Sequence, residues 1–447
     1  MVGAVGLAGR LGLVSIPAHL ELSIYLSLAV ISIVLLILGF VNSSSAGVKE
    51  FMNEPKPAMV ENRIARRPTW AEIDLDALAN NFRLIRKHVG GQVKVLAAVK
   101  ANAYGHGAVE CARRLEAEGV DWFGVALPEE GLELREAGIS KPILCLGGFW
   151  KSQERVCLQN SLTPVVYRLD MIDALDRAAH EAGLMANVHV KVDTGMGRLG
   201  VRCNAIREFC DALSRFQHVR VDGLMTHLAA ADDRSQEEFT RNQLKHFEQA
   251  VNAFRQYGFA PRYIHAANSA ATFAYPTSWG NMIRPGGTLY GFTRDVLPSD
   301  VRAPSLRPVM SLRSRIMLLK TVSAGEKLGY GCVFETTRDS LIATIPIGYE
   351  DGYRRALSNR GRAIVGGAFA PVVGRVSMDL TLLDVTDVSG VSLDDEVTLL
   401  GQDSELSITA EELGEFAGTI SYEITCGISN RVPRRYFRTE TSAKWTA

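Results

Sequence analysis

The feature that most constrains the fold is a regular alternation of short apolar runs and amphipathic helical stretches between residues 93 and 291. Apolar runs rich in Val and Ile are typical of buried strands, and helical periodicity between them is typical of crossover helices. The runs occupy residues 93–99, 122–127, 142–147, 163–167, 187–192, 219–225, 263–267 and 282–291. We therefore expect an α/β fold with a (β/α)8 barrel, the closed form of such an alternation.

An open doubly wound sheet shows a similar alternation and is the alternative to a barrel. Its dinucleotide-binding version places a GxGxxG turn directly after the first strand. The turn after VKVLAAV instead reads KANAYGHG, which lacks that spacing. The sequence therefore favours the barrel and gives the dinucleotide-binding version little support.

The pattern changes after Pro304, where short alternating runs such as SLIATIPIG and DEVTLLG are separated by Gly, Asp and Ser. This texture is typical of a mostly antiparallel sheet. We therefore expect a barrel domain over residues 68–302 and a C-terminal β-domain over residues 303–447. A first strand near residues 69–75 is a candidate to pair with the C-terminal domain.

Residues 1–67 precede these domains and include an apolar run without charged side chains, LSIYLSLAVISIVLLILGFV, at residues 22–41. A helix of about 20 apolar residues is long enough to cross the hydrocarbon core of a bilayer. We therefore expect an N-terminal apolar helix outside the core fold, a candidate membrane anchor, followed by a linker. Basic residues are more frequent after the run than before it, which favours a cytoplasmic catalytic domain.

Two alternatives to a membrane anchor stay open. A signal peptide cleaved near SSSAG is disfavoured, because the apolar run is long for such a peptide and the segment before it carries little charge. Translation from Met59 is the other alternative, because MVENRIARRPTWAEIDLDAL would be an ordinary beginning for a soluble chain.

Charge and cysteine content argue against several classes of protein. The chain has 49 basic and 49 acidic side chains, so no excess of positive charge suggests a nucleic-acid partner. Its seven cysteines are odd in number and never spaced as CxxC, which is unlike a disulfide framework or a zinc site. We expect reduced thiols in a cytosolic fold and no metal site.

Lys100 ends the first apolar run and is followed by a turn with Asn102, Tyr104 and His106. In a (β/α)8 barrel the active site forms at the carboxyl ends of the strands. A lysine at the end of an apolar strand loses its proton readily and can form a Schiff base with a carbonyl compound. Lys100 is therefore the first candidate catalytic residue.

Polar residues also follow the fifth to eighth runs. They are Lys191, Asp193 and Arg198 after the fifth, His227 after the sixth, Asn268 and Ser269 after the seventh, and Arg284, Gly286 and Gly287 after the eighth. Barrel enzymes frequently bind phosphate at the loops after strands seven and eight, where helix N–H groups and bare glycine backbone favour an anion. A lysine at strand one with a phosphate site there points to pyridoxal phosphate.

Nine motifs occur in one order along the chain: AVKANAYGHG, KVDTGMGRLG, GLMTHLAAAD, ANSAA, MIRPGGTLYG, GYG, IPIGYEDGYRR, GRVSMD and SYEITCGISNRVPR. In this order and spacing the chain resembles the alanine racemase family from about Thr69 to Phe437. The resemblance implies a pyridoxal-phosphate-dependent isomerase that interconverts L- and D-alanine and supplies D-alanine for peptidoglycan. It also implies a cytoplasmic homodimer. The chain departs from the family in two places: the N-terminal segment lies outside the resemblance, and Asn430 stands where a tyrosine is common.

The resemblance implies roles for individual residues. Lys100 would bind the cofactor covalently and act as one of two acid/base groups, and Tyr330 of the partner subunit would act as the other. Arg198 would contact the cofactor's phenolic oxygen and lie near the substrate carboxylate. Met378 of the partner subunit would help to seat the substrate.

Further roles concern the cofactor. Its phosphate would be bound by three hydroxyl side chains and by backbone: Tyr104, Ser269, Tyr422 and Gly286. Arg284 would face the pyridine nitrogen, and because a guanidinium keeps its proton, that nitrogen should stay unprotonated. His227 is a further cofactor-site residue, and with Arg284 it would supply the positive charge that a tyrosine base needs. Lys191 matches a position that is often carbamylated.

Other activities fit the sequence less well. A racemase of broader range, acting on serine or lysine, is the nearest alternative. A basic amino-acid decarboxylase of the same plan would place an acidic residue where Arg284 stands, and a cofactor carrier of the barrel type would lack the C-terminal β-domain. A metal-dependent barrel hydrolase would need HxH after the first strand, which AVKANAYGHG does not supply.

Overall fold

The computed structural model describes residues 67–302 and 304–438. The candidate membrane segment, residues 22–41, lies outside the described residues, as does the rest of the N-terminal extension up to Arg66. Within the described part of the chain, no helix is both long enough and apolar enough to cross a membrane.

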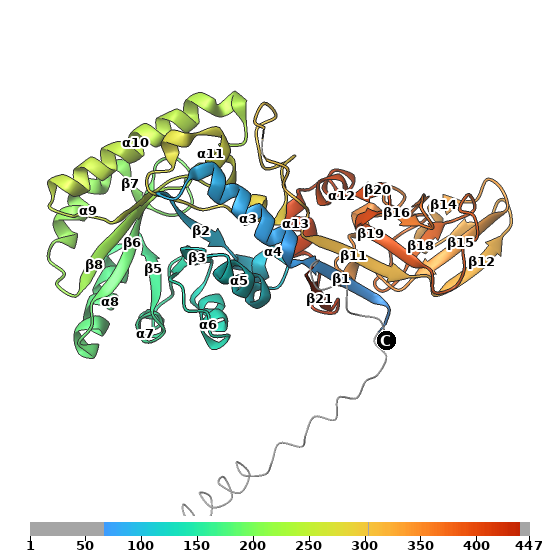
Figure 1. Ribbon diagram of the computed structural model, residues 1–447, viewed down its shortest axis with the longest axis horizontal. Helices are drawn as coiled ribbons and strands as arrows, with labels where there is room; N and C mark the ends of the chain where they lie inside the picture. Colours follow the sequence, from blue (N-terminus) through green and yellow to red (C-terminus); the bar gives the residue numbers. More distant parts are fainter. Residues whose placement is uncertain (1–66, 303, 439–447) are drawn as a thin grey trace, which may run out of the picture. The chain divides into compact units, whose positions relative to one another are not determined.

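Eight parallel strands form a nearly closed barrel, in the order β10-β2-β3-β4-β5-β6-β8-β9 (Figure 1). The strands are β2 (Lys94–Ala98), β3 (Trp122–Val125), β4 (Ile143–Cys145), β5 (Leu162–Val166), β6 (Ala186–Asp193), β8 (Val219–Met225), β9 (Tyr263–His265) and β10 (Met282–Ile283). β9 and β10 are joined by isolated hydrogen bonds, such as that from Asn281 N to Ile264 O at 3.1 Å, instead of a regular ladder. The expected barrel is confirmed in this nearly closed form.

The helices between the strands bury one face each against the barrel. They are α3 (Leu75–Val89), α5 (Ala108–Ala117), α6 (Pro128–Glu136), α7 (Glu154–Gln159), α8 (Leu169–Ala182), α9 (Ile206–Leu213), α10 (Glu237–Gln256) and α11 (Ser269–Ala274). In α10 the buried positions include Gln243, Phe247, Ala250 and Phe254, which recur every three or four residues as an amphipathic helix requires.

Two strand expectations were wrong in detail. The run expected over residues 282–291 is a strand only at Met282–Ile283, and the 3-10 turn η4 (Gly287–Tyr290) follows it, because the intervening Pro-Gly-Gly segment leaves the sheet. A short extra strand, β7 (Val201–Arg202), pairs with β6 and was not expected.

The β-domain is mostly antiparallel. Its main sheet has the order β17-β16-β19-β11-β1-β21, and a three-stranded sheet has the order β12-β15-β18. Its strands are β11 (Met310–Arg315), β12 (Leu318–Val322), β13 (Lys327–Leu328), β14 (Phe334–Glu335), β15 (Ser340–Ile345), β16 (Arg362–Val365), β17 (Ala368–Pro371), β18 (Thr381–Asp384), β19 (Glu396–Asp403), β20 (Leu406–Ile408) and β21 (Arg434–Phe437). The helices α12 (Ala410–Ala417) and α13 (Ser421–Cys426) precede the last strand.

β1 (Thr69–Asp74) precedes the barrel in sequence but belongs to the sheet of the β-domain. It pairs antiparallel with β11 and parallel with β21. The chain therefore enters the β-domain first, crosses to the barrel through α3, and returns at β11.

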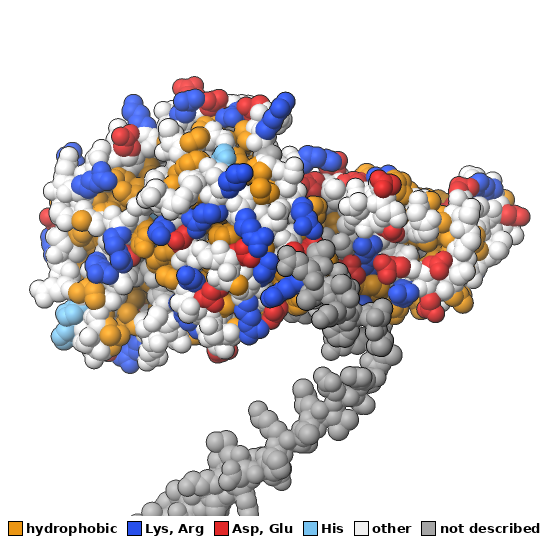
Figure 2. All heavy atoms as spheres, in the orientation of Figure 1, with side chains coloured by type: hydrophobic (Ala, Val, Ile, Leu, Met, Phe, Trp, Pro, Cys, Tyr) orange, Lys and Arg blue, Asp and Glu red, His pale blue; other side chains and the backbone are white. Residues whose placement is uncertain are grey.

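The barrel interior is filled by side chains from six of its strands. Leu96, Trp122, Leu144, Val165, Met225 and Met282 form one buried cluster, as expected for a packed barrel without a pore. Four of the seven cysteines are buried, whereas Cys203, Cys332 and Cys426 are exposed, and none forms a disulfide. On the face shown in Figure 2, basic and acidic side chains are interspersed.

Candidate active site

One cavity of about 660 Å³ opens at the carboxyl ends of the barrel strands. It gathers most of the side chains that the sequence predicted: Lys100, Tyr104, Arg198, His227, Ser269, Arg284, Gly286 and Tyr422, together with Lys191, Asn268 and Gly287. Tyr422 lies on α13 and Lys191 lies near the end of β6, whereas the other residues follow β2, β6, β8, β9 or β10. The barrel topology thus explains why residues far apart in sequence meet here.

Lys100 begins a left-handed turn, α4 (Lys100–Tyr104), instead of ending the strand as expected, because β2 ends at Ala98. The backbone φ is 51° at Ala101, 54° at Asn102, 52° at Ala103 and 54° at Tyr104. L-residues disfavour this conformation by about 1–2 kcal/mol each, so four in succession require support from their surroundings. Such strain is concentrated at functional sites.

Hydrogen bonds supply that support. The Glu130 carboxylate accepts a bond from Ala101 N at 2.7 Å, and the Asn102 side chain accepts one from Ala108 N at 2.8 Å. Nδ1 of the buried His106 lies 2.9 Å from Ala103 O and 3.0 Å from Tyr104 O, so it donates to the turn in the Nδ1–H tautomer. The turn is therefore held from both sides.

The environment of Lys100 favours the neutral amine. Burial and the nearby Arg198 guanidinium lower its pKa, although Glu130 acts in the opposite direction. Burial, together with Arg198 and Arg284, also lowers the pKa of Lys191, to about 8. A neutral Lys100 amine is the form that attacks a carbonyl carbon.

Arg284 is buried and held by neutral acceptors. Its Nη1 lies 2.9 Å from His265 Nδ1 and donates to His265 O at 3.0 Å, while Nη2 donates to Thr226 O at 2.7 Å and Ala266 O at 3.0 Å. Burial lowers the pKa of this guanidinium to about 9, so it remains protonated at neutral pH. The cavity therefore presents a fixed cation at its inner wall.

The histidines near Arg284 are neutral. Burial and the positive charge of Arg284 lower the pKa of His265 well below its usual range, and His227 behaves in the same way. His189 Nδ1 lies 2.9 Å from His265 Nε2, which extends the chain of buried rings. Burial next to existing cations disfavours protonation of His227, so Arg284 is the stronger candidate for the positive charge that was expected from both.

A candidate anion site lies around Gly286 and Gly287. The Ser269 hydroxyl accepts a hydrogen bond from Gly286 N at 2.8 Å. A Cβ at Gly286 would lie 2.4 Å from the Tyr104 hydroxyl, and a Cβ at Gly287 would lie 2.5 Å from the Tyr422 hydroxyl. Glycine is thus required for the backbone to approach both phenols closely, which leaves N–H and O–H groups together at one end of the cavity.

Arg198 is carried by a loop that Asp193 organises. The Asp193 carboxylate accepts hydrogen bonds from Gly195 N at 3.1 Å, Gly197 N at 3.0 Å and Arg202 Nη1 at 2.8 Å. Arg198 itself is exposed and lines the mouth of the cavity.

Tyr330 and Met378 lie elsewhere. Both belong to the β-domain, where they are 70% and 50% exposed, and neither lines the cavity that contains Lys100. A single chain therefore does not bring the two predicted bases together.

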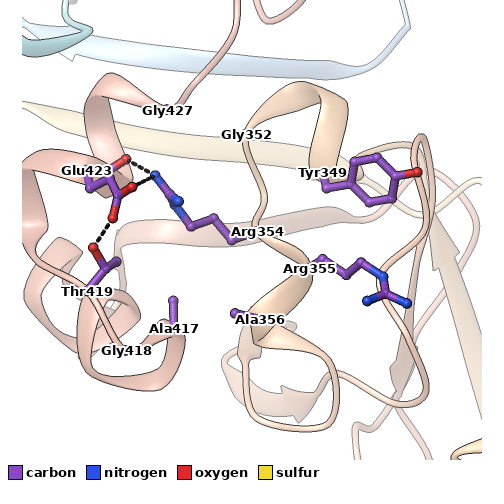
Figure 3. A pocket seen from close by; sticks show the side chains of 10 residues that line it. All are labelled: Tyr349, Gly352, Arg354, Arg355, Ala356, Ala417, Gly418, Thr419, Glu423 and Gly427. Carbon is purple, nitrogen blue, oxygen red and sulfur yellow. Dashed lines mark hydrogen bonds and ion pairs between the residues drawn. The ribbon is translucent and has the colours of Figure 1, made fainter.

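A second hollow of about 460 Å³ lies in the β-domain (Figure 3). Two of its charged groups form an ion pair, in which Arg354 Nη2 lies 3.1 Å from Glu423 Oε1 and donates to Glu423 O at 2.8 Å. None of the predicted site residues lines this hollow. The barrel cavity, which most of them line, is therefore the candidate active site.

Sequence reasoning missed the supporting residues of the site. His265 and Thr226 fix Arg284, and Glu130 fixes the turn after Lys100. His265 belongs to the apolar run that was assigned to a strand, and its position at the end of β9 was the available signal.

Comparison with known proteins identifies the family. Residues 73–294 match the alanine racemase N-terminal domain and residues 309–436 match the alanine racemase C-terminal domain. The chain belongs to the alanine racemase family. The alanine racemase of Geobacter sulfurreducens is 47% identical over 375 residues, which cover 83% of this chain and 97% of the relative. That of Halothermothrix orenii is 42% identical over 377 residues, with 84% and 98% covered.

Solved structures give the same result. An alanine racemase of Clostridium difficile 630 has a TM-score of 0.79 at 37% identity and covers 83% of this chain and 96% of that one. The alanine racemase from a D-cycloserine-producing Streptomyces lavendulae has a TM-score of 0.77 at 35% identity, with 83% and 97% covered. With membership of the alanine racemase family come its activity, the racemisation of alanine, and its cofactor, pyridoxal 5'-phosphate.

The cavity residues fit that cofactor. Lys100 offers an amine of lowered pKa for its aldehyde, and the Tyr104, Ser269 and Tyr422 hydroxyls beside Gly286 and Gly287 suit its phosphate. The hydrogen-bond partners of Arg284 are a histidine ring and backbone carbonyls, so no carboxylate in the described residues neutralises its charge. A guanidinium donates hydrogen bonds and keeps its proton, so it suits a cofactor ring nitrogen that is unprotonated. Each end of the cofactor thus has a complementary group.

Proposed function

We propose that this member of the alanine racemase family interconverts L- and D-alanine with two bases, Lys100 and Tyr330. Racemisation requires a proton to leave one face of Cα and another to arrive on the opposite face. Two groups on opposite sides are the smallest set that does this in both directions. Pyridoxal phosphate, when bound, supplies the electron sink that makes the Cα–H bond acidic.

The observation that carries this proposal is the convergence of Lys100, Arg198 and Arg284 with an anion site in one cavity. In the proposal Lys100 moves a proton at one face of Cα. Arg198 would contact the cofactor's phenolic oxygen and lie near the substrate carboxylate. Tyr104, Ser269 and Tyr422 bind the phosphate beside Gly286.

Arg284 controls the reaction outcome in this proposal. It would donate a hydrogen bond to the ring nitrogen while keeping its own proton, because even its lowered pKa of about 9 is above neutrality. Because the ring nitrogen then receives no proton, the cofactor ring accepts less negative charge from the substrate. Side reactions that need a strongly electron-withdrawing ring, such as transamination, are thereby disfavoured.

A second copy of the chain completes the site in this proposal. Tyr330 and Met378 are exposed on the β-domain and absent from the cavity of their own chain, which supports their contribution to a partner's cavity. Each subunit of the homodimer would then supply a lysine base to its own site and a tyrosine base to the other.

We propose a cytoplasmic site for the reaction, which would supply D-alanine for peptidoglycan. Residues 22–41, if translated, would anchor the chain to the membrane with the catalytic domains on the cytoplasmic side. Protease added to intact spheroplasts tests this. Protection of the catalytic domains and their membrane fractionation are expected, whereas their digestion would contradict the proposed orientation.

The activity is tested with the full chain and pyridoxal phosphate, supplied separately with L-alanine, L-serine and L-lysine. Conversion of L-alanine to an equal mixture of both enantiomers, faster than either other substrate reacts, is expected. Preferred turnover of serine or lysine would point to a broader racemase. Release of carbon dioxide without D-alanine would overturn the proposal in favour of a decarboxylase.

A further inference from the structure

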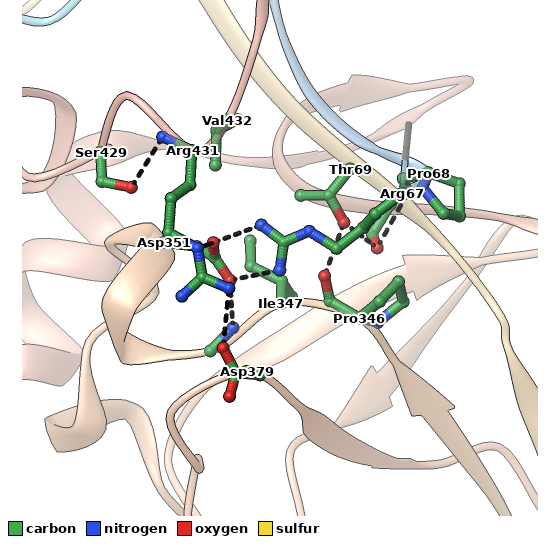
Figure 4. A network of polar contacts seen from close by, with 12 residues as sticks. Arg67, Pro68, Thr69, Pro346, Ile347, Asp351, Asp379, Ser429, Arg431 and Val432 are labelled. Atoms are coloured by element: carbon green, nitrogen blue, oxygen red, sulfur yellow. Dashed lines mark hydrogen bonds and ion pairs between the residues drawn. The ribbon is translucent and has the colours of Figure 1, made fainter. Parts of the chain in front are cut away.

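Four charged side chains from separate segments form one cluster in the β-domain (Figure 4). Asp351 lies at its centre and is 0% exposed. Arg67 precedes β1, Arg431 precedes β21, and Asp379 lies in the turn before β18. None of these four residues lines the barrel cavity.

Asp351 is saturated with donors. Its carboxylate accepts hydrogen bonds from both terminal nitrogens of Arg67, that from Nη1 at 2.9 Å, and from Gly348 N at 3.0 Å. Arg431 Nε lies 3.5 Å away. A buried carboxylate without such partners is strongly destabilising, so the position of Asp351 depends on Arg67.

The loop that Asp351 closes rests directly on the turn that carries Met378. Tyr349 N donates to Ser377 O at 2.9 Å, and Glu350 N donates to Met378 O at 3.1 Å. A Cβ at Gly348 would lie 2.3 Å from Met378 O, so the two backbones are in close contact. A displacement of Asp351 would therefore reach the Met378 turn through these backbone contacts.

Arg431 provides a second connection to the same turn. Its Nη2 donates to Asp379 Oδ1 at 2.7 Å, and Asp379 is the residue after Met378. Ser429 N also donates to Asp351 O at 3.0 Å, which ties the segment after α13 to the cluster. The turn is thus held at Met378 through backbone hydrogen bonds and at Asp379 through an ion pair.

We propose that Asp351, paired with Arg67 and Arg431, is a positioning residue that fixes the Met378 turn and so sets the affinity of the enzyme for alanine. The inference rests on the proposed function, because it is there that Met378 seats the substrate. Asp351 acts through backbone and does not contact the substrate. Its loss should weaken substrate binding more than it slows proton transfer at Lys100.

The test compares Arg67→Met, Arg67→Lys and Asp351→Asn in the full chain loaded with pyridoxal phosphate. The matched control is Arg262→Met, which breaks another two-point pair with a buried carboxylate, that of Asp222 at 2.6 and 2.9 Å at the opposite end of the barrel strands. The measurements are KM and kcat for both enantiomers, inhibition by propionate, and cofactor absorbance. Propionate has the carboxylate and carbon skeleton of alanine but no amine, so it reports binding without turnover.

We expect Arg67→Met and Asp351→Asn to raise KM and the propionate inhibition constant by about tenfold, because a small shift of the Met378 turn weakens its oriented contact with the substrate. The value of kcat should change less. Arg67→Lys should recover part of the affinity, since it restores the charge but not the two-point geometry. Arg262→Met should lower the melting temperature and leave KM unchanged.

Unchanged KM and inhibition constant in folded, cofactor-loaded variants would overturn the inference, and so would an equal rise in KM for Arg262→Met. If Arg67→Met and Asp351→Asn do not fold, Asp379→Asn decides, because Asp379 is half-exposed and its change leaves the buried carboxylate paired. A smaller rise in KM is expected for Asp379→Asn. An unchanged KM in that variant would overturn the inference. Failure of the unmodified chain to racemise alanine would instead reject the proposed function.

Discussion

At the scale of single residues, the chemistry of Lys100 is set by burial more than by any partner. Burial is the largest cause of its lowered pKa, and Arg198 is the next. Bond formation with an aldehyde requires the neutral amine, so a lower pKa extends cofactor attachment to lower pH than an ordinary lysine, with a pKa of about 10.4, would allow.

Arg198→Met should shift the pH dependence of covalent cofactor attachment to higher pH. Removing the cation raises the pKa of Lys100, so less neutral amine is present at a given pH, but the burial effect remains and the shift is partial. Absorbance of the attached cofactor across a pH series measures the midpoint. Arg202→Met is the control, because Arg202 lies in β7, directly after that loop, and pairs with Asp193; an equal shift there would contradict the explanation.

Tyr330→Phe tests the second base. The change keeps the ring and removes the hydroxyl, so racemisation should fall by the ~10² to 10⁴ typical of a lost general base while cofactor absorbance persists. In deuterium oxide the variant should still exchange the α-proton of one enantiomer through Lys100, and exchange that of the other far more slowly. Exchange of both enantiomers at the rates of the unmodified protein would refute the role.

At the scale of elements, the left-handed turn after β2 could not be predicted from KANAYGHG. Alanine and tyrosine disfavour positive φ, and the contacts that offset that cost include one from Glu130, which is distant in sequence, and local ones from His106 and Asn102. The sequence did locate Lys100 at the end of an apolar run, because strand periodicity is a local property. It could not show which groups hold Arg284, since His265 and Thr226 come from other strands.

Gly287→Ala tests the loop that forms the anion site. The new Cβ would lie 2.5 Å from the Tyr422 hydroxyl, so the phenol or the loop must move and phosphate binding should weaken by at least about tenfold. Equilibrium binding of pyridoxal phosphate measures this. Gly91→Ala, with nothing within 4 Å of its Cβ, should leave binding unchanged, and equal affinities for the two variants would argue against the assigned site.

At the scale of the whole molecule, alternating runs were sufficient to predict the barrel and the change to antiparallel strands near Pro304. They were not sufficient to show how the first and last strands of the sheet order, β10 and β9, close the barrel. These two strands are joined by a few hydrogen bonds and not by a regular ladder. The assignment of Tyr330 as a base came from the family resemblance alone. Its exposure on the β-domain now makes a second subunit the central element of the account.

Subunit complementation tests that element most directly. Lys100→Ala and Tyr330→Phe subunits are each expected to be nearly inactive, and mixed dimers are formed by unfolding and refolding them together. In a mixed dimer one of the two sites contains both Lys100 and Tyr330, whereas the other contains neither. We predict that racemisation of alanine returns in proportion to the mixed dimer, up to half the activity of the unmodified dimer. A mixture that stays inactive, although mixed dimers are demonstrated by mass, would contradict the account of a racemase whose two bases come from different subunits.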